Sequence, residues 1–380
     1  MKNFILIFIL ISFFGCKKEQ NIPEMPINTT KKSNIAYAEG FSITNGVNFN
    51  ILEIKNPWPK AEKNFKYVLI SAESAAKTTF ADDAYDGIII TPIEKIVVTS
   101  TTHIPALELL NVEKTLVGFP GTDYVSSKKT RARIDSKLVR ELGKNEGLNT
   151  EVLLSIHPNL VVAFGVDGKS KSLQTIKNAN IPVVYNGDWV ENSPLAKAEW
   201  IKFFGALYNK EQEAETLFKQ IETDYNAAKK LALNTKNKPT VLCGAMHKDI
   251  WYLPNGESTE AQLLKDANTN YLWSETTGKG SLSLNFEVVF NKARTASLWF
   301  SPSYYTSLEA LEKGSKHYTA FDAFKNKKVY SFSNTTGKTG GVTYYELGTA
   351  RPDLVLKDII KICHPELLKN YEPYFFKPLL

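Results

Sequence analysis

Side chains suited to binding a ligand gather in loops that follow expected strands. In the first half of the chain they are Thr102, His103, Tyr124, Arg131, Arg133, Asp167 and Trp189, and in the second half they are His247, Trp251, Tyr304 and Tyr344. Aromatic faces offer large contact areas at low cost in conformational entropy, and guanidinium groups bind carboxylates or catecholates through charge-assisted hydrogen bonds. The set therefore predicts a binding surface for a large, flat or anionic molecule. For each aromatic side chain taken alone, packing in the core is an equal alternative.

Phosphate-binding and catalytic motifs fail on inspection. Residues 168–170 and 337–339 read Gly-Lys-Ser and Gly-Lys-Thr, but Ala163 and Phe332 stand where a phosphate-binding loop requires its first glycine. The chain contains neither the Gly-x-Ser-x-Gly elbow of hydrolases nor the His-Glu-x-x-His helix of metalloproteases. We therefore expect a protein that is not an enzyme, with no catalytic residue and no cofactor.

The five histidines are spread along the chain, and no two of them have the helical spacing of metal ligands. We therefore expect no metal site. His103 and His247 occupy corresponding places, directly after the first strand expected in each half, where open α/β sheets bind their ligands. A solvated loop position is the alternative for each histidine.

The elements that must position these side chains form an α/β pattern. Residues 49–54 and 65–70 lie among turn signals and predict the strands of N-terminal β-hairpins. Short apolar strands then alternate with amphipathic helices, which is typical of parallel sheets covered by helices. The expected strands span residues 95–98, 115–118, 160–164 and 181–185 in the first half and 240–243, 297–300 and 328–332 in the second.

Between the two halves, residues 210–233 contain neither glycine nor proline and predict a helix about 35 Å long. A helix of this length can join two lobes. We therefore expect an α/β fold of two doubly wound lobes joined by a single long backbone helix. The expected divisions are a signal segment at 1–16, a tether at 17–33, an N-terminal lobe at 34–192, connecting helices at 193–236 and a C-terminal lobe at 237–380.

The first sixteen residues have the order of parts found in an export signal. Lys2 precedes an almost unbroken apolar run over residues 4–14, which is about half the length that a bilayer-spanning helix needs. Residues 13–16 resemble a lipobox, with Phe13 at the place where leucine is usual. We therefore expect a lipoprotein that is acylated at Cys16 and anchored in the cell envelope, facing the periplasm. A plain signal peptide and a buried helix are the alternatives.

The amino-acid composition limits the classes of protein to which the chain could belong. Hydrophobic residues make up 43% of the chain, which is ordinary for a soluble globular body. Only Cys243 and Cys363 follow Cys16, so the fold cannot depend on a framework of disulfides. The net charge of +6 is spread through the sequence and does not indicate nucleic-acid binding.

The second half repeats a short pattern of the first. Asn149 and Glu151 precede one expected strand, and Asn285 and Glu287 precede another at the same spacing. Each pair predicts a helix cap followed by an acidic residue in the first turn. Complementing a helix N-terminus is one interpretation of each glutamate.

Several segments carry a family resemblance. They are residues 93–100, 107–111, 117–118 and 149–162 in the first half and 286–287 and 321–330 in the second. They resemble segments of the two-lobed binding proteins that serve ABC importers of ferric siderophores, haem and cobalamin, over residues 95–368. The chain departs from the family's usual pattern at Asn159, where the family has aspartate, and at residues 293–295.

The resemblance implies a ligand held in a cleft between the lobes, with only small hinge motion. It also implies that one surface glutamate on each lobe pairs with arginines of the importer's membrane subunits, and these positions fall on Glu151 and Glu287. We therefore expect a monomeric substrate-binding lipoprotein that delivers an iron complex or a corrinoid to an ABC permease and its ATPase.

In the cleft we expect Trp189 and Trp251 as walls, with Arg131 and Arg133 neutralising an anionic chelate. Siderophore, haem and cobalamin all stay open as the ligand, because aromatic and basic loops suit each of them. Two rival functions also stay open. One is an enzyme on the same two-lobed scaffold, and the other is a surface or periplasmic capture lipoprotein that works with an outer-membrane receptor.

Overall fold

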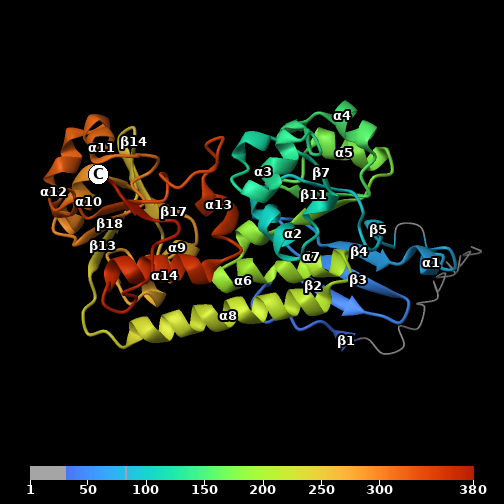
Figure 1. The fold of residues 1–380 in the computed structure, drawn as a ribbon, viewed down its shortest axis with the longest axis horizontal. Coiled ribbons are helices and arrows are strands. Elements are labelled where there is room, and N and C mark those ends of the chain that lie inside the picture. The colour runs from blue at the N-terminus through green and yellow to red at the C-terminus, as the bar shows by residue number, and fades with distance from the viewer. Residues whose placement is uncertain (1–30, 82–83) are drawn as a thin grey trace, which may run out of the picture.

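The computed structural model describes residues 31–81 and 84–380. The expected signal segment, Cys16 and nearly all of the expected tether lie outside the described residues. Within those ranges, no helix is both long and apolar enough to cross a membrane. The chain forms two α/β lobes, with one long helix running along both of them (Figure 1).

A five-stranded sheet, the N-terminal sheet, begins the described chain. Its strands β1 (Lys31–Lys32), β2 (Phe41–Asn45), β3 (Phe49–Ile54), β4 (Phe65–Ile70) and β5 (Gly87–Ile90) lie in sequence order, and α1 (Ala72–Ala75) precedes β5. All neighbouring strands are antiparallel except β4 and β5. Asn45 pairs with Asn50, so the Asn45-Gly46 signal lies in the turn between β2 and β3. This arrangement confirms the expected hairpins.

The first lobe is built on a parallel sheet. Its strands β6 (Ile96–Val98), β7 (Leu116–Phe119), β8 (Arg140–Glu141), β11 (Leu160–Phe164) and β12 (Val183–Asn186) take the order β12-β11-β6-β7-β8. Its helices are α2 (Ile104–Leu109), α3 (Lys128–Asp135), α4 (Thr150–Ile156), α5 (Lys171–Asn178), α6 (Pro194–Glu199) and α7 (Ile201–Leu207), and β9 (Gly143–Lys144) pairs with β10 (Gly147–Leu148). The central strands are buried along almost their whole length, as helices on both faces require. After β6 the chain adds β7 and β8 on one side of that strand, and then β11 and β12 on its other side. The direction of strand order therefore reverses between β6 and β11, and this place is the switch point of the sheet.

The second lobe repeats this plan with an antiparallel addition. Strands β13 (Thr240–Cys243), β16 (Asn270–Tyr271), β18 (Leu298–Phe300), β19 (Val329–Ser331) and β20 (Lys377–Pro378) take the order β16-β13-β18-β19-β20, and only β20 is antiparallel. Strands β14 (Ala245–His247), β15 (Ile250–Pro254) and β17 (Ser281–Asn285) form a second sheet. The helices are α9 (Thr259–Asp266), α10 (Phe286–Ala293), α11 (Leu308–Gly314), α12 (Asp322–Lys325), α13 (Thr343–Leu347) and α14 (Pro352–Cys363). Cys243 and Cys363 are both free and buried in this lobe.

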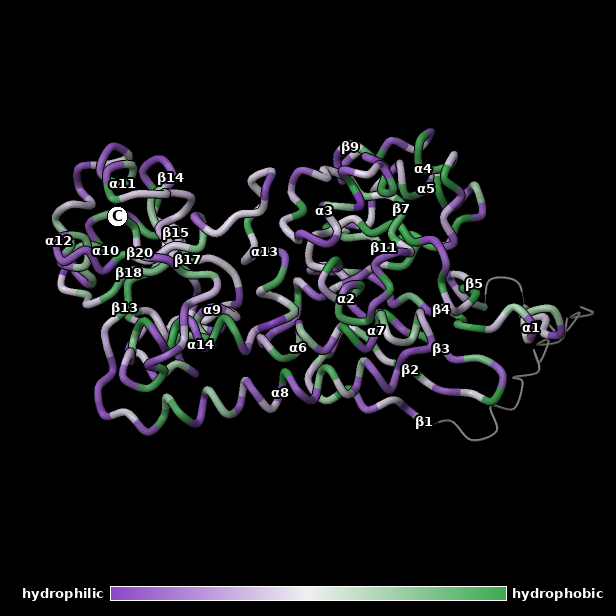
Figure 2. The backbone as a smooth tube through the Cα atoms, viewed as in Figure 1, coloured by the Kyte–Doolittle hydropathy of each residue, from purple (hydrophilic) through white to green (hydrophobic). Residues whose placement is uncertain are grey.

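Helix α8 (Glu211–Leu233) joins the two lobes and begins within one residue of its expected start. Its apolar side chains divide between two cores: Ala214, Phe218 and Ile221 belong to the first lobe, and Tyr225, Ala228 and Ala232 belong to the second. Hydropathy accordingly alternates along α8, whereas β7 and β11 are hydrophobic throughout their centres (Figure 2). Two doubly wound lobes on one helix confirm the predicted fold class.

Candidate ligand-binding cleft

A cleft runs between the lobes at the carboxyl ends of both parallel sheets. In the first lobe it is lined by residues 100–102, which follow β6. In the second lobe it is lined by Gly244 after β13, Ser301 after β18 and Phe332 after β19. Open α/β sheets bind their ligands at this edge, beside the switch point. The topology of both lobes therefore directs a ligand to the same space.

The second lobe contributes an aromatic pocket with a volume of about 360 Å³. We define this pocket by six of its lining rings, namely Tyr252, Phe300, Phe332, Tyr344, Tyr345 and Phe376. Phe332 and Tyr344 are stacked, with ring centroids 4.4 Å apart, and both contact Phe376. Because the rings hold one another in place, the pocket presents a rigid apolar surface.

Two further cavities continue the aromatic pocket toward the first lobe. A central cavity of about 320 Å³ lies between residues 100–102 and the side chains of Tyr344 and Tyr345. A third cavity of about 670 Å³, which we call the lysine groove, is lined by Lys55, Lys60, Lys197 and Lys279 together with Trp189, Glu39, Glu191 and Glu260. Glu260 lines all three cavities. The cavities therefore form one continuous cleft.

Glu260 is held at this junction by the start of α9. Ser258 caps the helix by accepting a hydrogen bond from the backbone N–H of Ala261 at 3.1 Å, which places Glu260 in the first turn. The Glu260 side chain is exposed, and within the described part of the chain it has neither a hydrogen bond nor an ion pair. It therefore offers a free negative charge at the centre of the cleft.

Three of the predicted ligand-binding residues line the cleft. Thr102 lines the central cavity, Trp189 lines the lysine groove, and Tyr344 lines both the central cavity and the aromatic pocket. The Trp189 ring lies 5.6 Å from that of Phe164, and its indole N–H has no partner among the described residues. These three positions stay proposals for ligand contact.

His103 and Trp251 do not reach the cleft, because both are fully buried inside their lobes. The His103 ring contacts Phe204, and burial lowers its pKa to about 3, so the imidazole is neutral. Trp251 stacks on Trp299 and donates its indole N–H to the Cys243 carbonyl at 2.9 Å. The expectation that these two side chains contact a ligand is therefore corrected, and both are core residues.

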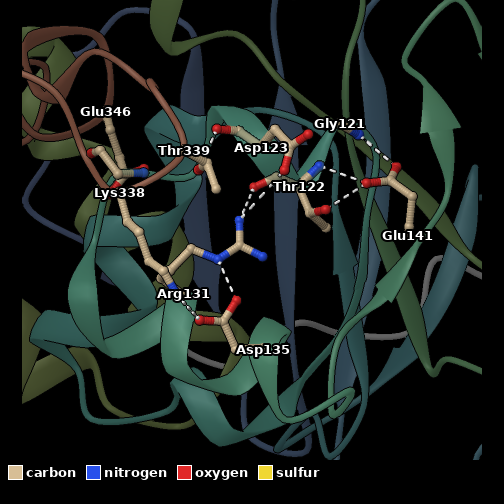
Figure 3. Close-up of polar contacts among 10 residues, drawn as sticks. Gly121, Thr122, Asp123, Arg131, Asp135, Glu141, Lys338, Thr339 and Glu346 are labelled. Carbon is tan, nitrogen blue, oxygen red and sulfur yellow. Dashed lines mark hydrogen bonds and ion pairs between the residues drawn. The ribbon is translucent and has the colours of Figure 1, made fainter.

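Arg131 and Arg133 are also occupied elsewhere. Arg131 is buried, donates to the Thr122 carbonyl at 2.8 Å and pairs with Asp135 at 3.1 Å (Figure 3). Arg133 donates to the Lys114 carbonyl at 2.8 Å. Neither arginine lines any of the three cavities. The expectation that they neutralise a bound anion is corrected, since both side chains lie outside the cleft and hydrogen-bond to backbone carbonyls of the first lobe.

The four other predicted ligand residues lie outside these cavities. Tyr124, Asp167, His247 and Tyr304 are all exposed. The ring centroid of Tyr304 lies 6.4 Å from that of Tyr345, which lines the cleft.

A strap from the second lobe, residues 336–347, crosses to the first lobe. Lys338 pairs with Asp135 at 3.0 Å, and the Thr339 hydroxyl donates to the Asp123 carbonyl at 2.8 Å (Figure 3). Glu346, in α13, accepts hydrogen bonds from the backbone N–H groups of Ser126 and Ser127 at 2.7 and 2.8 Å. The strap is therefore a second connection between the lobes besides α8.

The exposed glutamates of the internal repeat follow equivalent caps. Asn149 accepts from the Val152 N–H at 3.0 Å, and Asn285 accepts from the Val288 N–H at 2.9 Å. Glu151 and Glu287 lie in the first turns of α4 and α10 and are exposed. The two helices belong to different lobes (Figure 1).

Several charged residues that line the cleft were not predicted from the sequence. Lys279 and Glu260 come from separate segments of the second lobe, and Lys197 of α6 joins them because the lobes face each other. Glu260 could be found only as an acidic residue after a serine cap, a pattern shared with many helices that bind nothing. Among the residues described, no group of three His, Cys, Asp or Glu side chains could hold a metal ion.

The sequence of this chain is similar to a known protein family and to known proteins. Residues 96–335, more than half of the chain, match the family described as periplasmic binding protein. An uncharacterized lipoprotein of Methanocaldococcus jannaschii is 28% identical over 296 residues, covering 75% of this chain and 68% of that protein.

Solved structures share the fold. A possible iron-binding (periplasmic solute-binding) protein from Staphylococcus epidermidis superposes with a TM-score of 0.56 at 17% identity, covering 72% of this chain and 100% of that one. The periplasmic heme-binding protein RhuT from Roseiflexus sp. RS-1 gives a TM-score of 0.55 at 20% identity, covering 72% and 99%. The N-terminal sheet and the strap both lie outside residues 96–335.

Proposed function

The chain belongs to the periplasmic binding protein family, and on that premise we propose that it is the substrate-binding lipoprotein of an ABC importer. The ligand is an iron complex, as a siderophore or haem, or a corrinoid, and it binds in the cleft between the lobes. The observation that carries this proposal is the continuous cleft, which joins an aromatic pocket to a lysine groove at the carboxyl ends of both sheets.

The dimensions of the cleft suit a ligand of this size. Small-molecule sites have volumes of roughly 300–1,000 Å³ and combine apolar walls with a few polar groups. The aromatic pocket, at about 360 Å³, and the lysine groove, at about 670 Å³, fall within this range. A flat macrocycle or a chelate with aromatic arms could contact the stacked rings of Phe332 and Tyr344 while its polar edge extends into the groove.

Delivery to the importer is assigned to Glu151 and Glu287. Each carboxylate is exposed at the first turn of a capped helix, one on each lobe. Two fixed negative charges on separate lobes could pair with arginines on the two membrane subunits of a permease. Acylation of Cys16 would keep the carrier near that permease. The similar protein of Methanocaldococcus jannaschii is itself named a lipoprotein, which supports this anchor.

Charge reversal tests the delivery step. We expect the double substitution Glu151→Arg and Glu287→Arg to abolish ligand uptake by cells while ligand affinity in solution stays unchanged. The matched control reverses Glu146 and Glu312, which are also exposed and lie one on each lobe. Uptake that survives reversal of Glu151 and Glu287, or that is lost equally in the control, would contradict the assignment.

A further inference from the structure

The N-terminal sheet forms one wall of the ligand cleft, although it lies outside the family match. The loop after β3 contributes Lys55 and Lys60 to the lysine groove, and Glu39 and Gly40 contribute from the segment before β2. The facing wall belongs to the second lobe and contributes Lys279. The groove is therefore closed on one side by segments that flank β2 and β3 of the N-terminal sheet and lie outside residues 96–335.

This wall is fixed to the first lobe by buried carboxylates. Glu199 accepts hydrogen bonds from the backbone N–H groups of residues 36–38 at 2.7 to 2.9 Å. Glu191 accepts from the Gly40 N–H and the Trp200 indole N–H, both at 2.9 Å. A side chain at position 40 would meet Trp200 at 2.8 Å, so only glycine permits this close approach. The segment that leads into the sheet is therefore held rigidly beside the cleft.

The loop itself is anchored by Trp58. The Trp58 ring packs edge-on against Tyr185 with centroids 4.9 Å apart, and it fills the space beside Gly165 and Gly168. Pro57 lies against Gly187, where an added Cβ would meet the proline Cα at 3.0 Å. Because Pro57 and Trp58 are held in this way, the neighbouring lysines have a defined position at the edge of the groove.

The side chains that line the groove carry a small excess of positive charge, with four lysines against three glutamates. None of Lys55, Lys60, Lys197 and Lys279 forms an ion pair with any described residue. Of the three glutamates that line the groove, Glu191 is occupied by backbone and indole donors, and Glu39 accepts from the Asn192 amide at 3.0 Å. Glu260 is the one lining carboxylate with no partner within the described ranges, and it lies at the end of the groove that adjoins the aromatic pocket. The groove is thus lined by four lysines and three glutamates, and none of these lysines is held in an ion pair with a described residue.

We propose that the lysine groove binds the carboxylate-bearing edge of the ligand while the aromatic pocket holds its apolar body, so that Lys55 and Lys60 of the N-terminal sheet select for an anionic ligand. This inference rests on the proposed function and adds the charge and the orientation of the ligand. The two ends of the cleft differ in chemistry, and a ligand with one apolar and one anionic end satisfies both.

A pair of porphyrins that differ only in charge tests the proposal. Haemin carries two carboxylates, and its dimethyl ester carries none. We expect the unaltered protein to bind haemin about tenfold more tightly than the ester, since each partly exposed charge pair contributes a few-fold in affinity. Added salt should reduce this preference, because it screens exposed charges.

Substitution of the two loop lysines should remove most of the preference. In the Lys55→Gln, Lys60→Gln variant, affinity for haemin should fall most of the way to that for the ester, because only Lys197 and Lys279 are left in the groove, while affinity for the ester stays unchanged. The control variant Lys66→Gln, Lys95→Gln removes two exposed lysines that do not line the groove and should retain the preference. Equal affinities of the unaltered protein for haemin and ester, or a loss of both in the loop variant with normal thermal unfolding, would overturn the inference.

The same titrations separate this inference from the proposed function. If the protein binds neither porphyrin but binds cyanocobalamin, the charge selection is wrong and the importer function stands. If it binds no porphyrin, no ferric siderophore and no corrinoid, both are wrong.

Discussion

The strap between the lobes should loosen as the pH rises, because its central carboxylate is buried. Glu346 is 3% exposed, and burial raises its pKa to about 7 from the ordinary value of 4.5. Glu108, whose carboxylate binds Thr130 in the same region, raises the pKa further by repulsion, whereas the N–H groups of Ser126 and Ser127 lower it. The folded state therefore favours the neutral acid more than the unfolded state does.

The sign and size of the effect follow from proton linkage. An acid whose pKa is raised on folding binds more protons in the folded state between its two pKa values, so stability is lost as the pH rises through that window. Here the window runs from 4.5 to about 7. At about 1.4 kcal/mol for each pKa unit, Glu346 should remove about 2 to 3 kcal/mol of the free energy of unfolding between pH 5 and pH 8.

The variant Glu346→Gln isolates this contribution, because its side chain stays neutral. Asp188, Glu191 and Asp358 also have raised pKa values, but both proteins share them. Urea unfolding of both proteins at pH 5, 6, 7 and 8 should show the stability of the variant rising relative to the unaltered protein by that amount. Hydrogen exchange of residues 124–130 at pH 8 should locate the difference at the strap. A stability difference that stays constant across this range would refute the reasoning.

Two further predictions concern single substitutions, one in the cleft and one in the strap. Trp189→Phe should reduce the ligand-induced change in tryptophan fluorescence, whereas Trp251→Phe should leave it intact, because Trp189 and Trp58 line the lysine groove and Trp251 is buried in the core; an unchanged response in the first variant would contradict the site. Gly341→Ala should lower the free energy of unfolding by roughly 1–3 kcal/mol, because the added methyl group would meet the Tyr124 carbonyl oxygen at 2.1 Å. Gly147→Ala is its control, since no atom lies within 4 Å of the added group, and equal losses in urea unfolding would argue against a tight strap.

The sequence predicted the fold well, because local patterns determine it. Residues 211–233 lack helix breakers and carry apolar side chains on one face, so α8 forms wherever two cores can receive them. The buried strands β11 and β13 are short apolar runs, which only a sheet covered on both faces accommodates.

The candidate site was predicted less completely, because it depends on contacts between distant segments. Thr102 and Trp189 were identified from their places after strands, and both line the cleft. Trp251 has a similar place, but stacking on Trp299 turns it into the core, and no local pattern reveals that partner. Arg131 is different, since its partner Asp135 lies four residues later on the same helix, where a helical pair could have been expected from the sequence.

Native mass spectrometry can show whether the cleft between the lobes holds one large ligand. The protein would be mixed in turn with haemin, a ferric siderophore and cyanocobalamin, and examined alongside the Tyr344→Ala, Tyr345→Ala variant. We expect a complex of one ligand per chain with at least one of the three, and a much weaker complex in the variant, because both rings line the aromatic pocket and the central cavity. No complex with any of them, or a complex that the variant forms equally well, would contradict it.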